Sequence, residues 1–526
     1  MAEATPLARP QPAARPLTTR DVIAFFFMVF GMFMAILDIQ IVSSSLAEIQ
    51  AGISASADEI SWVQTSYLIA EVVMIPLSGT LTRIFSTRYL FAASALGFTF
   101  MSLMCALSGS IGEMMVWRAL QGFVGGAMIP TVFATSFSIF PPEKRNIVSP
   151  IIGLIATMAP TVGPTIGGYL TEIFSWHWLF LVNIIPGIAV TIGTYLFIDF
   201  DKPDFKLAKN FDWAGLALLA LFLGTLEYVL EEGAKEGWFS SALIFKLAAI
   251  CTVSGSVFFT RMFTMKNPLV DFSAFKNRNF MSGCIFSFTM GIGLYGLTYL
   301  YPVYLARIQH YSAMMIGETM FVTGVAMFFT APIAGRLSSK LDPRIMIGTG
   351  FVGFAIGTWM ASSITSQWTF NELLIPQILR GVSLMLCMVT VTNVALGTLN
   401  PMQLRGASGL FNLTRNLGGA VGLAIINTVM NQRMDLHLAR LHESVHWGSA
   451  TAEQTLNNMT GALSSLGSDA STAALSRLAG LVRQQSMTMA IADIFYILTW
   501  LFLGIVLMLP LMQKPAQQKA AGGGGH

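Results

Sequence analysis

Charged residues are scarce in this sequence of 526 residues: Asp, Glu, Lys and Arg together make up 11%, against about 25% in ordinary soluble domains. Hydrophobic residues make up 54% of the chain. So little charge excludes an ordinary soluble domain and indicates a protein that crosses the lipid bilayer many times. The net charge is only +3, and we expect no nucleic-acid partner.

Cysteine is also rare. The four cysteines are Cys105, Cys251, Cys284 and Cys387, and all lie in apolar segments. They show neither a disulfide framework nor metal-ligand spacing, so we read them as small apolar side chains and expect no metal and no cofactor. Residues 1–20 lack the apolar core of a cleaved signal, so we expect the first apolar segment to direct insertion.

Long apolar runs dominate the rest of the chain. Each crossing of a bilayer needs about 20 mostly apolar residues. Fourteen segments satisfy this rule, near 21–46, 60–82, 87–109, 112–139, 147–170, 178–199, 213–231, 243–263, 280–305, 315–338, 344–364, 372–399, 405–431 and 487–511. Their apolarity is continuous, whereas barrel strands alternate, so the sequence predicts an all-α polytopic membrane protein.

The basic residues predict an orientation. If the N-terminus lies in the cytosol, 20 of the 30 Lys and Arg residues fall on the cytosolic side. This bias follows the positive-inside rule, and the even number of spans then places both termini in the cytosol.

Two short basic turns match at a constant offset of 256 residues. They read Pro76-LS-Gly79-T-Leu81-TRIFST-Arg88 and Pro332-IA-Gly335-R-Leu337-SSKLDP-Arg344. A weaker echo relates Arg118-AL-Gln121-Gly122 to Gln377-IL-Arg380-Gly381. Internal duplication is how many secondary transporters are built, with the substrate site between the halves. Chance similarity between two basic turns is the alternative.

The repeat predicts a domain organisation. We expect a tail at 1–20, a six-helix half at 21–199, an inserted helix pair at 213–263, a second six-helix half at 280–511 with an outer loop at 432–486, and a tail at 512–526. The loop is long, polar and, by our interpretation, partly helical. We assign a cytoplasmic gate to residues of the repeated turns: Gly79, Arg83, Arg88, Gly335 and Arg344.

Among the ionisable residues inside predicted spans, we single out Asp38, Glu71, Arg118 and Glu227. Intramembrane charge is costly and usually marks an ion or proton path, although a buried structural hydrogen bond is the alternative. An acid beside an arginine forms a tunable proton switch. We therefore predict that Asp38 and Glu71 carry protons, that Arg118 sets their proton affinity, and that Glu227 contributes less because it lies outside the repeats.

The fifth predicted span is rich in glycine and proline. Small residues spaced by four let two helices approach closely, and prolines remove backbone donors and bend the helix. We interpret this span as a packing joint between helices. The residues that form it are Gly153, Ala159, Pro160, Gly163, Pro164, Gly167 and Gly168.

Several motifs together resemble the fourteen-helix drug:proton antiporters of the major facilitator superfamily. They are the fifth-span motif, Arg118-ALQGFVGGAMIP, Leu37-Asp38, Phe211-Asp212-Trp213-A-Gly215, Trp176-HWLFLVNIIPG and Asn412-LTRNLGG. Within that subfamily, the chain resembles the inner-membrane pumps of Emr-type tripartite exporters. The resemblance implies two six-helix bundles plus an inserted pair, in a bacterial inner membrane. It also implies export of hydrophobic or amphipathic toxic compounds in exchange for protons, with a periplasmic adaptor and an outer-membrane channel as partners.

The chain departs from that family pattern in two places. The first span has Gln40, Ser43 and Ala47 where the subfamily usually has threonine, asparagine and proline. The turn after the second span has Arg83 and Ser86 where an acid and a glycine are usual, so the acid that usually latches the cytoplasmic gate is missing. As substrate-binding residues we assign Gln40, Glu71, Gln121, Asn412 and Arg415.

Other functions stay open at this point. A proton-coupled importer or a facilitator on the same fold is one alternative. A membrane-bound zinc hydrolase is another, because His442, Glu443 and His446 match a zinc-protease pattern, although no third ligand follows at a suitable spacing. The glycines of Gly291-I-Gly293-LY-Gly296 match a dinucleotide fingerprint, but they lie inside an apolar span and follow no strand, so we interpret them as helix packing.

Overall fold

The computed structural model describes residues 17–513, except 57–58, 266–267, 447 and 464–468. All regular elements in these ranges are helices. The α-helices are α1 (Thr19–Ser44), α2 (Leu46–Ile53), α3 (Trp62–Ala106), α4 (Ile111–Gly125), α5 (Met128–Ile139), α6 (Pro142–Ile173), α7 (Trp178–Leu181), α8 (Ile184–Phe197), α9 (Trp213–Glu232), α10 (Ala242–Thr264), α11 (Arg278–Arg307), α12 (Ala313–Ser338), α13 (Pro343–Ala361), α14 (Phe370–Gly397), α15 (Pro401–Ser444), α16 (Ala450–Ala462) and α17 (Ala470–Val506). Short 3₁₀ turns are η1 (Phe205–Asn210), η2 (Trp238–Ser240), η3 (Phe272–Lys276) and η5 (Leu509–Leu511).

Many spans begin at a side chain that caps the helix. Thr18 and Asp21 form a capping box at the start of α1, and Thr369 and Glu372 form another at α14. Asp212 caps α9 by accepting a hydrogen bond from the backbone N–H of Gly215. Such residues satisfy N–H groups that have no partner within the helix, which fixes where each apolar run starts.

Twelve helical segments in the described ranges are long and apolar enough to cross a membrane. One of them, α3, has 45 residues and would extend about 68 Å if straight, more than twice the roughly 30 Å hydrocarbon thickness. It is broken at Ser86, and residues near its two ends, Val63 and Ser102, both contact side chains of α4. The helix α3 is therefore a hairpin of two spans.

The helix α15 contains the predicted span 405–431 and is a further crossing helix, although it is not among these twelve segments. It packs against α11, α3 and α17, so protein rather than lipid surrounds much of it and its sequence tolerates more polar residues. With α3 counted twice and α15 added, the twelve segments become the fourteen spans that the sequence predicts. The predicted all-α polytopic fold is confirmed.

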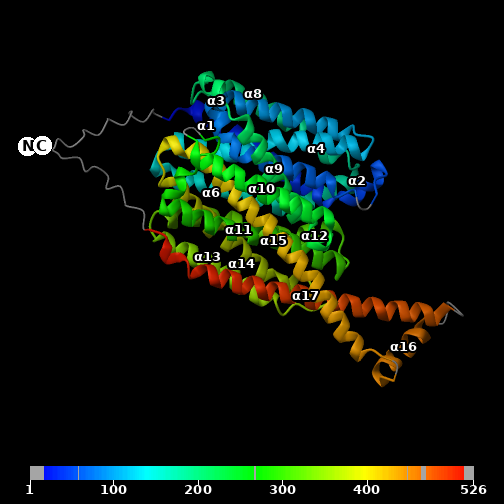
Figure 1. The fold of residues 1–526 in the computed structure, drawn as a ribbon. Coiled ribbons are helices and arrows are strands. Elements are labelled where there is room, and N and C mark those ends of the chain that lie inside the picture. The colour runs from blue at the N-terminus through cyan, green and yellow to red at the C-terminus, as the bar shows by residue number, and fades with distance from the viewer. Residues whose placement is uncertain (1–16, 57–58, 266–267, 447, 464–468, 514–526) are drawn as a thin grey trace, which may run out of the picture.

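Both described ends of the chain lie at one end of the helix bundle (Figure 1). We call this the basic end, because Arg20, Arg88, Arg344 and Arg405 lie there. Arg20 donates a hydrogen bond of 2.7 Å to the carbonyl oxygen of Leu196, and Arg344 donates one to the carbonyl oxygen of Met512. The opposite end, with α2, α7 and α16, is called the far end.

The helix α6 packs between the two predicted halves, with α1 on one side and α12 and α14 on the other. The inserted pair, α9 and α10, pack on each other. The helix α9 also contacts both predicted halves. The Trp62 ring of α3 lies 5.2 Å from the Tyr228 ring of α9, and α9 also packs against α15. Just beyond α9, the indole N–H of Trp238 in η2 donates to the Thr428 hydroxyl of α15 at 2.9 Å.

The segment predicted as an outer loop, 432–486, is mostly helical in its described part. The helix α15 continues to Ser444 and α17 already begins at Ala470, with α16 between them, so that the three form a projection at the far end (Figure 1). The segment is therefore more helical than we expected, and the helices that flank it run past the predicted ends of the spans. Hydropathy reports burial in lipid, whereas residues 432–444 are polar yet contain no proline or glycine to end the helix.

Candidate functional site

An ion pair is buried between α1 and α4. The Asp38 Oδ2 atom lies 2.6 Å from the Arg118 Nη1 atom, and both side chains are fully buried. Glycines bring the neighbouring helices close enough to enclose the pair: a Cβ atom on Gly122 would collide with the carbonyl oxygen of Tyr67 in α3. As a result, the guanidinium of Arg118 lies over the Tyr67 ring, 4.3 Å from its centre.

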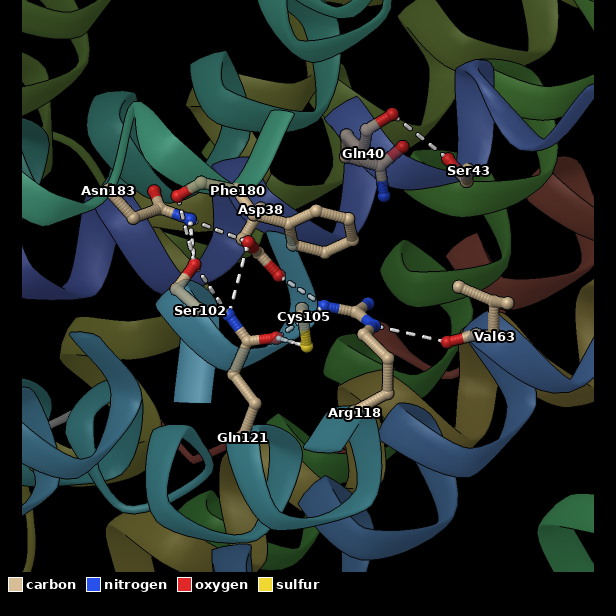
Figure 2. A network of polar contacts seen from close by, with 10 residues as sticks. All are labelled: Asp38, Gln40, Ser43, Val63, Ser102, Cys105, Arg118, Gln121, Phe180 and Asn183. Atoms are coloured by element: carbon tan, nitrogen blue, oxygen red, sulfur yellow. Dashed lines mark hydrogen bonds and ion pairs between the residues drawn. The ribbon is translucent and has the colours of Figure 1, made fainter. Parts of the chain in front are cut away.

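Neutral hydrogen-bond donors from other segments complete the contacts of the Asp38 carboxylate (Figure 2). Its Oδ1 atom accepts hydrogen bonds from the amide groups of Asn183 at 2.7 Å and Gln121 at 3.3 Å. Both amides also donate to the hydroxyl of Ser102, and Gln121 Oε1 accepts from Arg118 at 2.8 Å. We call these five residues the buried polar cluster. Its hydrogen bonds and the arginine satisfy the ionised form of the Asp38 carboxyl.

Two members of the buried polar cluster were not predicted from the sequence. Asn183 lies just before α8 and Ser102 in the second span of α3. A single amide within the apolar run LFLVNIIPG was the signal that pointed to Asn183. Gln121, assigned above to substrate, is fully buried within this cluster.

Glu71 lies in the first span of α3, outside the buried polar cluster. It is 2% exposed, and its Oε1 atom has no hydrogen-bond partner among the described residues. It interacts electrostatically with Arg118 and with Arg415 of α15. Arg415 donates a 2.6 Å hydrogen bond to Asn412 and its guanidinium lies 5.5 Å from the ring centre of Phe133 in α5. Glu71, Asn412 and Arg415 thus lie where the predicted halves meet.

The small residues of α6 allow close helix contacts on two sides. A Cβ atom on Gly163 would collide with the Gln40 side chain of α1, so Gln40 lies against this motif. A Cβ atom on Gly153 would approach Met388 of α14 to 3.2 Å, and Gly317 of α12 packs against Thr165. The motif therefore joins α6 both to its own half and to the other.

Two further buried charges inside the spans, Glu227 and Arg380, form no acid–arginine ion pair with any of the described residues. Glu227 of α9 is 4% exposed, and its Oε2 atom has no hydrogen-bond partner there. Arg380 of α14, which the weaker sequence echo relates to the Arg118 region, bonds to Gln377 at 3.4 Å and to the hydroxyl of Thr298. The second half thus contains a similar arginine–glutamine pair, with a threonine hydroxyl in place of a carboxylate.

The predicted gate residues all lie at the basic end. The Arg88 side chain bonds to Asp199 at 2.9 Å within its own half, whereas Arg83 is exposed. Gly335 is buried in α12, on the turn that precedes Arg344. Gly79 faces the other half: a Cβ atom there would lie 2.7 Å from the carbonyl oxygen of Arg405.

The histidine motif lies at the end of α15 in the projection. His442 and Glu443 belong to its last turn, and the His446 Nδ1 atom lies 2.9 Å from the carbonyl oxygen of Glu443. The described residues contain no group of three His, Cys, Asp or Glu side chains that could hold a metal ion.

Comparison with known proteins identifies the family. The sequence model of the family described as the Major Facilitator Superfamily matches residues 28–423. The chain belongs to this superfamily. It is an EmrB-like member, because it is 41% identical over 474 residues to the colistin resistance protein EmrB of Acinetobacter baumannii, covering 90% of this chain and 93% of that one. It is 30% identical over 505 residues to the multidrug export protein EmrB of Escherichia coli K12, covering 96% and 97%.

A solved structure supports the fold. The human organic anion transporter MFSD10 aligns with a TM-score of 0.57 at 12% identity, over 92% of this chain and all of that one. The resemblance stated from the sequence motifs is therefore confirmed. The chain is a multi-pass membrane transporter of the major facilitator superfamily and not an enzyme of the zinc-hydrolase class.

Proposed function

We propose that this protein is a proton-coupled antiporter that exports hydrophobic and amphipathic toxic compounds by alternating access. Relatives named for multidrug export and colistin resistance support this proposal. In our scheme the protein resides in a bacterial inner membrane with its basic end and both termini in the cytosol, as the positive-inside rule favours.

The observation that carries proton coupling is the buried Asp38–Arg118 pair. Removing one partner of a buried ion pair leaves an uncompensated charge, at a cost of about 3–5 kcal/mol. Protonation of Asp38 therefore has to be matched by a rearrangement around Arg118. We infer that this rearrangement couples proton release to the change between inward-facing and outward-facing states.

Glu71 has a different part in the scheme. A buried carboxylate without a hydrogen-bond donor is destabilised relative to the neutral acid, so Glu71 is suited to hold a proton. It faces the second half near Arg415 and Asn412, where a substrate would compete with the proton for the same carboxyl group. Gln40 lies beside this path on α1, and Glu227 of α9 is an additional acid of lesser weight in the scheme.

Alternating access requires the two halves, 21–199 and 280–511, to rock against each other. The small-residue face of α6 contacts α12 and α14 of the second half, so it forms a close-packed joint that seals the path during the motion. In our proposal the inserted pair, 213–263, covers another part of the interface between the halves, where α9 packs against α3 and α15.

We also propose that the projection formed by the ends of α15 and α17 with α16 docks a periplasmic adaptor that leads to an outer-membrane channel. It extends beyond the bundle, where a soluble partner has access to it (Figure 1). Deleting 446–468 while preserving insertion should abolish adaptor pull-down. Retained binding would contradict this part of the proposal.

Transport into inverted membrane vesicles tests direction and coupling together. An acidic vesicle interior should drive accumulation of a cationic dye by the wild-type protein, and dissipating the pH gradient should stop it. Asp38→Asn and Arg118→Ala should lose gradient-driven accumulation while remaining folded by gel filtration. Glu443→Gln is the matched control, because the hydrolase alternative predicts loss of function and the antiporter predicts none. Accumulation that survives both Asp38→Asn and Arg118→Ala would refute the coupling scheme.

A further inference from the structure

The two halves are tied together at the basic end by an ion pair. Asp201 lies in the loop between α8 and η1, and Arg405 lies in the first turns of α15. The Asp201 Oδ2 atom is 2.9 Å from the Arg405 Nη2 atom, and the side chains are 9% and 32% exposed. We propose that Asp201 and Arg405 form the latch that keeps the basic end closed and that separates in each transport cycle. This inference rests on the alternating access proposed above.

Asp201 is fixed to the first half by its remaining contacts. Its carboxylate accepts hydrogen bonds from the backbone N–H of Thr87 at 3.0 Å and from the Thr87 hydroxyl at 3.0 Å. Thr87 follows Ser86, the residue at which α3 is broken. The same loop is also held to α3 by the backbone N–H of Asp204, which donates to the carbonyl oxygen of Ile84 at 3.0 Å. The loop thus presents a carboxylate at the turn where the family usually has an acid and this chain has Arg83.

The helix α15 brings its backbone against the first half next to this pair. A Cβ atom on Gly409 would lie 2.8 Å from the carbonyl oxygen of Ile75, and the Ser408 hydroxyl donates to the carbonyl oxygen of Pro130 at 3.0 Å. With Gly79 against Arg405, these contacts close the basic end between α3, α5 and α15. Opening this end requires all of them to separate, and the ion pair is the charged member of the set.

A polar cavity of about 110 Å³ borders the latch. Hydroxyl groups and the arginine line it: Thr82, Thr87, Thr131, Thr135, Ser138 and Arg405. Such a volume has room for a few water molecules with several polar partners each. Water in this cavity lowers the free energy needed to separate the two charges. The ion pair therefore holds the basic end closed in this state without preventing it from opening.

Accessibility labelling tests whether the ion pair biases the closed state. Thr131→Cys places a thiol in the cavity, and the four native cysteines are all buried. In inverted vesicles, Asp201→Asn should speed modification of this thiol by a membrane-impermeant maleimide about fivefold, the population shift expected of a partly exposed ion pair. Asp199→Asn is the matched control, because Asp199 pairs with Arg88 of its own half, and it should leave the rate unchanged. An equal effect of both substitutions, or no effect of Asp201→Asn, would overturn the proposal.

Cross-linking tests whether the two residues must separate. In Asp201→Cys/Arg405→Cys, a short bis-methanethiosulfonate should arrest dye transport, and reductant should restore it. Full transport by the cross-linked protein would refute the latch while leaving antiport intact. Absence of gradient-driven transport in the wild-type protein would instead refute the proposed function, so the two failures are distinguishable.

Discussion

The turn within α3 places Ser86 at φ 73° and ψ 159°, a region of backbone conformation that is essentially restricted to glycine. A side chain there costs on the order of 1–3 kcal/mol. Substituting glycine removes this strain. It also destabilises the folded protein by about 0.5–1 kcal/mol, because glycine gives the unfolded chain more conformational freedom. The difference predicts that Ser86→Gly stabilises the folded protein by about 0–2.5 kcal/mol, with a central value of about 1 kcal/mol.

Unfolding in detergent micelles with an increasing fraction of SDS measures this effect. A gain of 1 kcal/mol raises the ratio of folded to unfolded protein about fivefold, which shifts the midpoint measurably. Ser86→Ala keeps a Cβ atom and should give no such gain. Ser94→Gly, at a buried helical position of α3, should destabilise by about 0.5–1 kcal/mol. Equal stability of Ser86→Gly and Ser86→Ala would refute the strain argument.

Three further outcomes follow from other contacts. Asn183→Leu removes a donor from the buried polar cluster and should lower gradient-driven dye transport more than tenfold, whereas an unchanged pH profile of transport would exclude the coupling role. Gly163→Leu should clash with Gln40 and lower the yield of folded protein on gel filtration, whereas Gly163→Ala should do so less. The pKa of Asp212 is held below its usual value by hydrogen bonds from Arg261, so its stabilisation of α9 is present above pH of about 3.9 and is lost as the pH falls through the lowered pKa. The stability difference between wild type and Asp212→Asn should therefore vanish in acid; a difference that persists there would contradict this reasoning.

The sequence predicted the spans and the charged residues of the site, because both depend on the cost of placing polar groups in lipid. Asp38 and Arg118 were recognisable as intramembrane charges without knowledge of the fold. Which acid pairs with the arginine was not, because that depends on how α1 and α4 are rotated against each other. Asp38 takes the arginine and the amide donors, whereas Glu71 has no hydrogen bond to Arg118.

Two features could not be predicted from the sequence, each for its own physical reason. The length of α15 depends on helix propensity, whereas our span boundaries came from hydropathy. The Asp201–Arg405 pair joins residues about 200 positions apart, in segments that look like ordinary polar connections. Only the packing of the two halves brings them together.

The helix α15 has a mechanical consequence. It is a single helix of 44 residues, about 66 Å long, with Arg405 near its first turn and the projection at its last. One continuous helix therefore connects the proposed latch at the basic end to the proposed docking surface at the far end. A partner that clamps the tip would apply torque at the opposite end, and release of the closure would swing the tip, so assembly and transport would be coupled through leverage.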